Sequence, residues 1–484
     1  MTNVFRILLL VTMMAGCTSR IEVEADLLIR HVNIIEVNAG ALLEDRDILI
    51  RGDSIVAVEQ GGKINTNSAK QVFNGDGKFV IPGLWDMHAH PDDPEVWRMN
   101  PVAVARDLLM PLFVANGVTG IRDMGGSLDV VKQWRRLGRD DQLLVPEIFA
   151  GGPLLDGPNP MWDGSVGINS PNEVPQVVDS LLQEGVDFLK VYSLLPGDIY
   201  WALSSYASEK EIAIVGHVPY EVRPSEAIGL KSQEHLLEIL LESSGRMTDI
   251  LSGKVSFNNV DNPADRYVAR NKFLLETFEP SRADSIFLTF VQNQVWHTPT
   301  LSMWYKNAFF EEEVIKDDTL LNYLPQYLRK YWEPGINDHL GHRTNVEFIK
   351  MKKQLVSKYL QLTKQMHDSG LKLLAGTDMG ANPLCFPGWG IHTELELFVK
   401  AGLSNNEALK TATLHPAQFL DLEDQYGAVE TGKKADLVIL DENPLLDISN
   451  TRMINSVIKK GDFYQREALD SILSAVKKGM AEIN

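Results

Sequence analysis

The first candidates for chemistry are two histidines, His88 and His90, at the end of the apolar run 80–87. Side chains alternate between the two faces of a β-strand, so residues two apart point the same way. Both imidazoles could therefore bind one metal ion from a single strand end, and imidazole is a common zinc ligand in proteins. An isolated pair is equally compatible with a structural role, so the assignment depends on further ligands.

Four more residues with suitable side chains lie in or after other short apolar runs: Lys190, His217, His235 and Asp378. Each histidine and the aspartate could be structural on its own. Lys190 interrupts an apolar run, where burial of a cation is costly. The lysine could reach solvent from a strand end. Alternatively, it could react with carbon dioxide to give a carbamate, whose two oxygens could bridge two metal ions.

The elements that must position these residues are short strands alternating with helical segments between about residues 80 and 420. Strands are predicted near 80–87, 118–123, 146–151, 187–192, 212–217, 232–235, 295–300 and 373–378. This alternation predicts an α/β fold, and eight strands favour a (β/α)8 TIM barrel. The C-terminal ends of barrel strands converge on one pocket. We therefore expect the candidate residues to meet there.

The ends of the chain differ from this middle part. Residues 17–79 and 425–465 contain alternating strand patterns and turn signals, which predict one small β-sandwich domain built from both terminal regions. The barrel would span 80–424, with helical insertions near 240–294 and 301–370, and a helix would occupy 466–484. The second insertion is rich in aromatic residues, which either pack its helices or form a lid over the pocket.

Local sequence words around these residues resemble the amidohydrolase superfamily. The resemblance covers about residues 25–460 and is carried by the following segments: 82–90 (PGLWDMHAH), Lys190, 216–219 (GHVP), His235, 375–378 (AGTD) and 432–438 (GKKADLV). The pattern is similar to the branch containing imidazolonepropionase-like proteins and metal-dependent prolidases, or Xaa-amino-acid dipeptidases.

The resemblance implies a role for each ligand. His88, His90 and Asp378 would hold a first divalent ion, and His217 and His235 a second; the resemblance further implies that carboxylated Lys190 and a hydroxide bridge them. Two cations would lower the pKa of the bridging water. Asp378 would also act in catalysis by moving a proton from the nucleophile to the leaving amine. Zinc is the default ion for nitrogen and oxygen ligands.

Other pocket candidates are less specific. Tyr192 could donate a hydrogen bond to the substrate carbonyl, and Tyr220 is a second candidate of this kind; both could instead be packed aromatics. Arg122 and Arg223 could each bind a substrate carboxylate. Alternatively, Arg122 could form a salt bridge at the barrel rim, and Arg223 could be a solvated surface residue. His297 could line the pocket. His392 and His415 are interpreted as structural residues.

The N-terminus predicts export. Arg6, an apolar stretch and small residues before Cys17 resemble a bacterial lipoprotein signal peptide over residues 1–16. The protein would then be anchored to a membrane by a lipid on Cys17, facing the periplasm. The formal net charge of −19 argues against nucleic acid or an anionic membrane surface as a partner.

Together these features predict a binuclear metal-dependent hydrolase that cleaves an amide or peptide-like bond in a dipeptide or N-acyl amino acid. A cyclic amidase, lactonase or phosphotriesterase would use the same ligands. A mononuclear deaminase is disfavoured by Lys190, and a non-catalytic surface binding protein by the complete ligand set. The sequence leaves side-chain preference and homo-oligomerisation open.

Overall fold

The computed structural model describes residues 25–93, 103–316, 318–337 and 340–483. The predicted signal peptide and Cys17 lie outside these residues. Among the helices in the described ranges, none has both the length and the apolarity needed to span a membrane.

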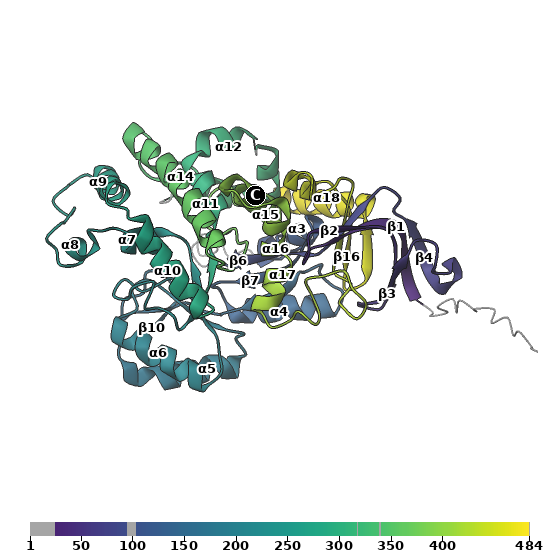
Figure 1. The fold of residues 1–484 in the computed structure, drawn as a ribbon, viewed down its shortest axis with the longest axis horizontal. Helices are drawn as coiled ribbons and strands as arrows, with labels where there is room; N and C mark the ends of the chain where they lie inside the picture. The colour runs from purple at the N-terminus through teal and green to yellow at the C-terminus, as the bar shows by residue number, and fades with distance from the viewer. Residues whose placement is uncertain (1–24, 94–102, 317, 338–339, 484) are drawn as a thin grey trace, which may run out of the picture.

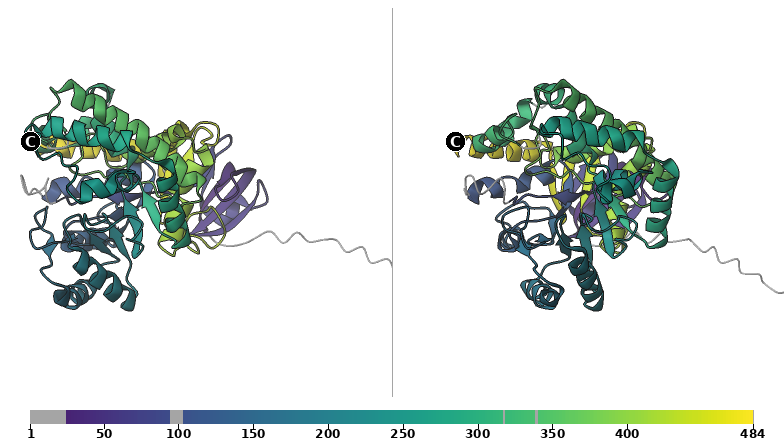
Figure 2. Two further views of the ribbon diagram at one scale, coloured as in Figure 1. Left: turned by 60° about the vertical axis from the view of Figure 1, so that its left-hand side comes forward. Right: turned by 90° about the vertical axis from the view of Figure 1, so that its left-hand side faces the viewer.

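Strands from both ends of the chain form one eight-stranded sheet in the order β17-β16-β15-β5-β1-β2-β3, with β4 also paired to β1. The purple N-terminal and yellow C-terminal strands lie against each other (Figures 1 and 2). The bounds are β1 (Ala25–Glu36), β2 (Ala41–Arg51), β3 (Ser54–Gln60), β4 (Ala69–Asn74), β5 (Phe79–Pro82), β15 (Leu437–Leu440), β16 (Ile454–Lys459) and β17 (Asp462–Gln465).

This terminal sheet bends around its own apolar core. Phe73 comes from β4, which pairs with β1, and Phe463 comes from β17 at one end of the strand order, yet their ring centroids are 5.1 Å apart. Ile29, Ile48 and Ile439 are buried in the same cluster. Alternating apolar residues on each strand supply this core, as the sequence pattern predicts.

The middle of the chain contains parallel strands that form most of a ring. They are β6 (Leu84–Ala89), β7 (Val118–Asp123), β8 (Glu147–Ala150), β11 (Leu189–Val191), β12 (Ile214–Gly216), β13 (Leu230–Glu234) and β14 (Trp296–Thr298). Neighbours pair in parallel from β6 to β8 and from β11 to β14. The Asp187 N–H donates to the Ala150 carbonyl at 2.9 Å and joins the two groups. Short strands β9 (Leu155–Asp156) and β10 (Val166–Gly167) extend beside β11.

Residues 373–379 close the ring between β14 and β6. The Leu374 N–H donates to the His297 carbonyl at 3.0 Å, and the Met87 N–H donates to the Ala375 carbonyl at 2.8 Å. Isolated bridges join this segment to both neighbours. The expected (β/α)8 TIM-barrel architecture is therefore confirmed.

Two of the predicted strands are wrong in detail. The run 80–87 is not one barrel strand, because Val80 and Ile81 pair with β15 and the barrel strand begins at Leu84. The run 373–378 is no regular strand. The Thr377 N–H is shared between the His88 carbonyl and the Asp86 side chain, and Asp378 has a left-handed backbone with φ of 56°.

Helices cover the barrel and follow its strands. They are α2 (Ala103–Asp107), α3 (Met110–Ala115), α4 (Leu128–Arg139), α5 (Val174–Glu184), α6 (Gly197–Glu209), α10 (Pro280–Gln292), α14 (Val346–Asp368), α15 (Trp389–Ala401), α16 (Asn405–Thr411) and α17 (Leu414–Phe419). The last helix of the chain is α18 (Arg466–Glu482), which packs on α3.

Both long intervals between late barrel strands contain additional helices. The first holds α7 (Leu237–Glu242), α8 (Met247–Leu251) and α9 (Pro263–Glu276); the second holds α11 (Leu301–Ala308), α12 (Phe310–Lys316), η3 (Asp318–Tyr323) and α13 (Gln326–Tyr331). Helices α8 and α9 project from the barrel in Figure 1. The Asn262 side chain caps α9 by accepting from two backbone N–H groups, and Pro263 occupies its first turn.

Candidate metal centre

The structure brings the predicted ligands together at the C-terminal ends of the barrel strands. His88 lies in β6 and His90 directly after it, while Lys190 lies in β11. His217 and His235 are the first residues after β12 and β13, and Asp378 lies in the segment that closes the ring. His88, His235 and Asp378 each offer one ligand atom, and these atoms lie within 4.8 Å of one another.

Asp378 is the common neighbour of the first two histidines. Its Oδ1 lies 3.3 Å from His88 Nε2 and 3.4 Å from His90 Nε2. The rings of His217 and His235 have centroids 4.7 Å apart, and those of His235 and His88 are 4.8 Å apart. The four imidazoles and the carboxylate therefore form one contiguous group.

The second nitrogen of each imidazole is held by a partner outside this group. His88 Nδ1 lies 2.9 Å from Glu234 Oε2, and His90 Nδ1 lies 3.3 Å from the Gly125 carbonyl. Corresponding contacts join His217 Nδ1 to Ser193 Oγ at 2.9 Å, and His235 Nδ1 to Thr300 Oγ1 at 2.7 Å. Such partners orient a metal-binding imidazole and leave Nε2 as the ligand atom.

Two buried nitrogen atoms at the centre lack a hydrogen-bond partner among the described residues. They are His88 Nε2 and Lys190 Nζ. Native proteins leave few buried polar atoms unsatisfied, so each one requires an explanation. His88 and His235 each offer an imidazole nitrogen, and Asp378 offers a carboxylate oxygen close to both. This set of donors fits a divalent cation.

Electrostatics favour the ligand forms of these groups. Burial, reinforced by the charge of Lys190, lowers the pKa of His88 to about 3. Burial also lowers the pKa values of His217 and His235. The adjacent imidazoles of His88 and His90 hold the pKa of Asp378 well below its usual range despite burial. Neutral imidazoles and an ionised carboxylate are the species that bind metal ions.

His90 and Lys190 differ from the other groups. The hydrogen bond and charge of Asp378 raise the pKa of His90, although burial opposes this shift. Burial lowers the pKa of Lys190 to about 8. The neutral amine is therefore a minor form at neutral pH, but a far larger fraction than for a lysine with the ordinary pKa.

Backbone strain is concentrated at the same place. His235 and Asp378 have φ values of 65° and 56°, and Thr300, the partner of His235, has φ of 50°. Non-glycine residues rarely adopt this left-handed conformation, and such residues cluster at functional sites. The left-handed backbone at these three residues turns the chain at the strand ends, so that the His235 and Asp378 side chains point toward the centre.

Tyr192 lies beside the centre. Its ring centroid is 4.2 Å from that of His217, and a hydrogen bond joins its hydroxyl to Trp162. Burial raises the pKa of Tyr192 above its usual value, so the hydroxyl remains protonated. Both Tyr192 and Tyr220 line a cavity of about 1030 Å³ that also contains His90, His217 and Asp378.

Arg122 does not line this cavity. It is fully buried beneath the centre, where its guanidinium donates to Glu234 at 2.9 and 3.1 Å and to the Met87 carbonyl at 2.6 Å. The salt-bridge alternative for Arg122 is therefore correct in kind, although the pair is in the barrel interior rather than at the rim. Sequence reasoning missed Glu234; its position directly before His235 was the available signal.

The remaining sequence candidates lie outside the cavity. Arg223 forms an exposed ion pair with Glu226 at 3.9 Å. His297 is buried in β14 and is absent from the residues that line the cavity. His392 and His415 make structural hydrogen bonds to Thr451 and to the Leu373 carbonyl, respectively, as the sequence predicted.

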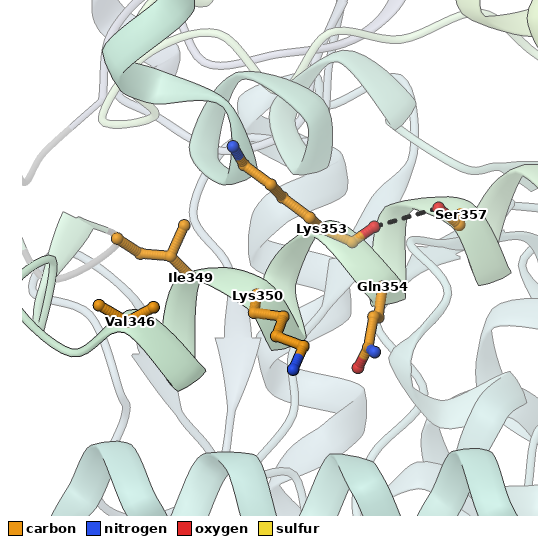
Figure 3. A pocket seen from close by; sticks show the side chains of 6 residues that line it. All are labelled: Val346, Ile349, Lys350, Lys353, Gln354 and Ser357. Carbon is orange, nitrogen blue, oxygen red and sulfur yellow. Dashed lines mark hydrogen bonds between the residues drawn. The ribbon is translucent and has the colours of Figure 1, made fainter.

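Some aromatic residues of the second insertion line the cavity, and others pack in the hydrophobic core. Trp304 lines the cavity, whereas Tyr331 and Trp332 are buried in the hydrophobic core. A separate hollow on the outer face of α14 contains none of the candidate metal ligands. It is lined by Val346, Ile349, Lys350, Lys353, Gln354 and Ser357 (Figure 3).

Comparison with known proteins places this site in a family context. A model described as "Amidohydrolase family" matches residues 313–463. The imidazolonepropionase of Alkaliphilus metalliredigens is 24% identical over 408 residues, which cover 82% of this chain and 84% of that protein. An adenine deaminase of Desulforamulus reducens is 30% identical over 95 residues, and the chain spans only 14% of that relative's length.

Solved structures share the fold. A bottromycin amidohydrolase has a TM-score of 0.73 at 22% identity, covering 94% of this chain and 90% of that chain. A putative prolidase from Bifidobacterium longum has a TM-score of 0.65 at 21% identity, covering 94% of this chain and 99% of that chain. At these identities the likeness establishes the fold and leaves the substrate open.

Proposed function

We propose that this chain, which resembles the amidohydrolase superfamily in sequence and fold, is a binuclear metal-dependent hydrolase of amide or peptide-like bonds in dipeptides or N-acyl amino acids. The observation that carries this proposal is the convergence of four imidazoles, Asp378 and the buried amine of Lys190 on one centre. Prolidase-like solved structures support the choice of bond.

In this proposal His88, His90 and Asp378 hold one divalent cation, and His217 and His235 hold the second. Zinc is the expected ion for these donors. The bound cations would supply Lewis acidity, which makes a water molecule nucleophilic at neutral pH and polarises the substrate carbonyl. The orienting partners of each Nδ1 support this assignment, because they leave the Nε2 atoms facing the centre.

Lys190 is proposed to carry a carboxyl group from carbon dioxide. The neutral amine attacks carbon dioxide, a nitrogen–carbon bond forms, and one proton is released. The carbamate then offers two oxygens to the cations. The pKa of about 8 supports this step, because it makes the reactive neutral amine more abundant at neutral pH than in a lysine with the ordinary pKa.

Asp378 and Tyr192 are the proposed catalytic residues. The Asp378 carboxylate would accept a proton from the attacking water and deliver it to the leaving amine. The Tyr192 hydroxyl would donate to the substrate carbonyl oxygen as negative charge develops there. Its hydrogen bond with Trp162 would hold the hydroxyl in place.

The test is the variant Lys190→Ala, measured for bound metal per chain and for hydrolysis of a dipeptide library. We expect loss of hydrolysis and loss of at least one bound ion, with partial recovery when a small carboxylic acid is added to replace the carbamate. Lys272→Ala is the matched control, because Lys272 is a solvent-exposed lysine on α9. Full activity and metal content in Lys190→Ala would exclude the carbamate bridge.

A further inference from the structure

The cavity extends well beyond the candidate metal ligands. Its volume of about 1030 Å³ lies at the upper end of the range of about 300–1,000 Å³ that is typical of small-molecule sites. The additional space adjoins α9, α11 and α14, the helices that lie between late barrel strands. Features of the substrate away from the scissile bond can therefore be recognised there.

Three aromatic side chains line this part of the cavity: Tyr267 of α9, Trp304 of α11 and Phe348 of α14. The ring centroids of Tyr267 and Phe348 are 4.8 Å apart. Trp304 is supported from behind by Tyr359, at 4.9 Å. Supported rings of this kind provide flat apolar surface, which suits an aromatic or large apolar side chain of a ligand.

Lys352 adds a cation to the same part of the cavity. It follows Phe348 by one helical turn, and its Nζ lies 5.1 Å from the centroid of the Phe348 ring. Burial, together with the charge of Arg343, lowers the pKa of Lys352 to about 7. An anionic group placed beside this lysine would stabilise its ammonium form, and charge-assisted hydrogen bonds of this type are strong.

The cavity is also polarised along its length. Glu238 also lines the cavity near the aromatic residues, but burial raises the pKa of its carboxyl to about 7, so it is only partly ionised near neutral pH. On the side of α4 and the loop after β9, the lining instead contains Asp129 and Asp163, and Arg106 in the same lining is paired with Asp92 at 2.5 Å. A ligand with a carboxylate at one end and an ammonium group at the other would therefore bind in one direction.

We propose that Lys352, Tyr267, Trp304 and Phe348 form the subsite for the carboxylate-bearing residue of the substrate, and that this residue has an aromatic or large apolar side chain. The inference rests on the proposed amide hydrolase function and specifies its substrate. The carboxylate binds the Lys352 ammonium group, while the side chain packs against the three rings. The amine-bearing end then lies toward the acidic part of the cavity.

The experiment measures binding of L-phenylalanine, L-phenylalaninol and glycine to the zinc-loaded protein by calorimetry. None of the three contains an amide bond, so hydrolysis does not interfere. We expect L-phenylalanine to bind about 10- to 100-fold more tightly than L-phenylalaninol, which lacks the carboxylate. Lys352→Met should abolish this difference, and Lys352→Arg should retain most of it.

Two substitutions on the outer face of α14 are matched controls. Lys350 and Ile349 line the separate hollow shown in Figure 3. Lys350→Met should leave the preference for the carboxylate unchanged. Phe348→Ala should weaken binding of L-phenylalanine about tenfold, whereas Ile349→Ala should not.

Equal affinities for L-phenylalanine and L-phenylalaninol in the wild-type protein would overturn the subsite, as would absence of binding by both. Equal effects of Lys352→Met and Lys350→Met would also overturn it. Hydrolysis of glycyl-L-phenylalanine, measured in parallel, separates the two proposals. If L-phenylalanine binding depends on Lys352 but the dipeptide is not hydrolysed, only the proposed enzymatic function is contradicted. If the dipeptide is hydrolysed but L-phenylalanine binding does not depend on Lys352, only the subsite is contradicted.

Discussion

The imidazole of His88 lies between two carboxylates. Its Nε2 faces Asp378 Oδ1 at 3.3 Å, and its Nδ1 lies 2.9 Å from Glu234 Oε2. Glu234 is held in turn by two hydrogen bonds from the fully buried Arg122. Since Arg122 and His88 also hold the pKa of Glu234 well below its usual range, this carboxylate is charged and fixes which nitrogen of His88 faces the centre.

Glu234→Gln is expected to weaken metal binding about 10- to 100-fold, the range seen when an orienting partner of a ligand is lost. It should also lower stability by about 3–5 kcal/mol, because Arg122 would be left as an uncompensated buried charge. Competition with a chromogenic chelator measures the first effect and thermal unfolding the second. Glu226→Gln, at an exposed carboxylate, should change neither. Unchanged metal affinity in Glu234→Gln would show that the contact does not position His88.

Individual residues were predictable from sequence where a chemical group ended an apolar run. This signal selected His88, His90, His217 and Asp378 as candidate ligands, Lys190 was selected because it interrupts such a run, and the family resemblance reinforced the choice. Glu234 could not be assigned in this way, because its role depends on two residues far away in the chain, His88 and Arg122. The same applies to Lys352, whose helical surroundings give no sign that it faces a cavity.

At the scale of elements, the least regular part of the ring carries Asp378, the carboxylate that lies beside both His88 and His90. Residues 373–379 connect β14 to β6 through isolated bridges, and Asp378 interrupts the strand geometry. The segment packs very closely on its neighbour: a Cβ atom at Gly376 would lie 2.6 Å from His88 Cβ and 2.7 Å from Thr298 Cγ2. Close approach at Gly376 therefore sets the distance between Asp378 and His88.

Gly376→Ala should force this segment away from β6. We expect a loss of stability of about 1–3 kcal/mol, the usual cost of overpacking, together with weaker metal binding because Asp378 moves from His88. Thermal unfolding and chelator competition measure both effects. Gly197→Ala is the control, since a Cβ atom there would meet nothing closer than 3.6 Å. If Gly376→Ala matched this control, the close contact would have no role in the site.

The order of strands and helices was largely predictable, because most barrel strands are short runs rich in apolar residues, although β13 (LKSQE) is largely polar. Errors arose where a run changes partners. Residues 80–82 pair in the terminal sheet and residues 84–89 pair in the barrel, although no charged or polar side chain interrupts residues 80–85. Hydrophobicity alone does not show where a run leaves one buried sheet and enters another. Likewise, insertion helices were expected near 240–294 and 301–370, but their packing around Trp304 and Phe348 depends on tertiary contacts.

On the scale of the whole molecule, the proposed ligands join parts of the chain that are distant in sequence. His88 and His90 follow the terminal sheet, His217 and His235 lie in the middle, and Asp378 follows both insertions. The ring is closed between β14 and β6 by few regular backbone hydrogen bonds. Bound cations would cross-link β6, β12, β13 and the closing segment, so metal binding and barrel stability should be coupled.

Removal of metal should therefore lower the unfolding temperature. At a free ion concentration about 1,000 times the dissociation constant, binding to the native state alone contributes about 4 kcal/mol, which corresponds to roughly 4–6 °C for a unit of this size. Differential scanning calorimetry of the zinc-loaded and chelator-treated protein measures this shift. Added zinc should restore the higher temperature, and a chelator already saturated with zinc should have no effect. Superimposable unfolding curves with and without metal would mean that the ions do not stabilise the closed barrel. The candidate ligands would then be held in place only by protein contacts, such as those of Arg122, Glu234 and Gly376.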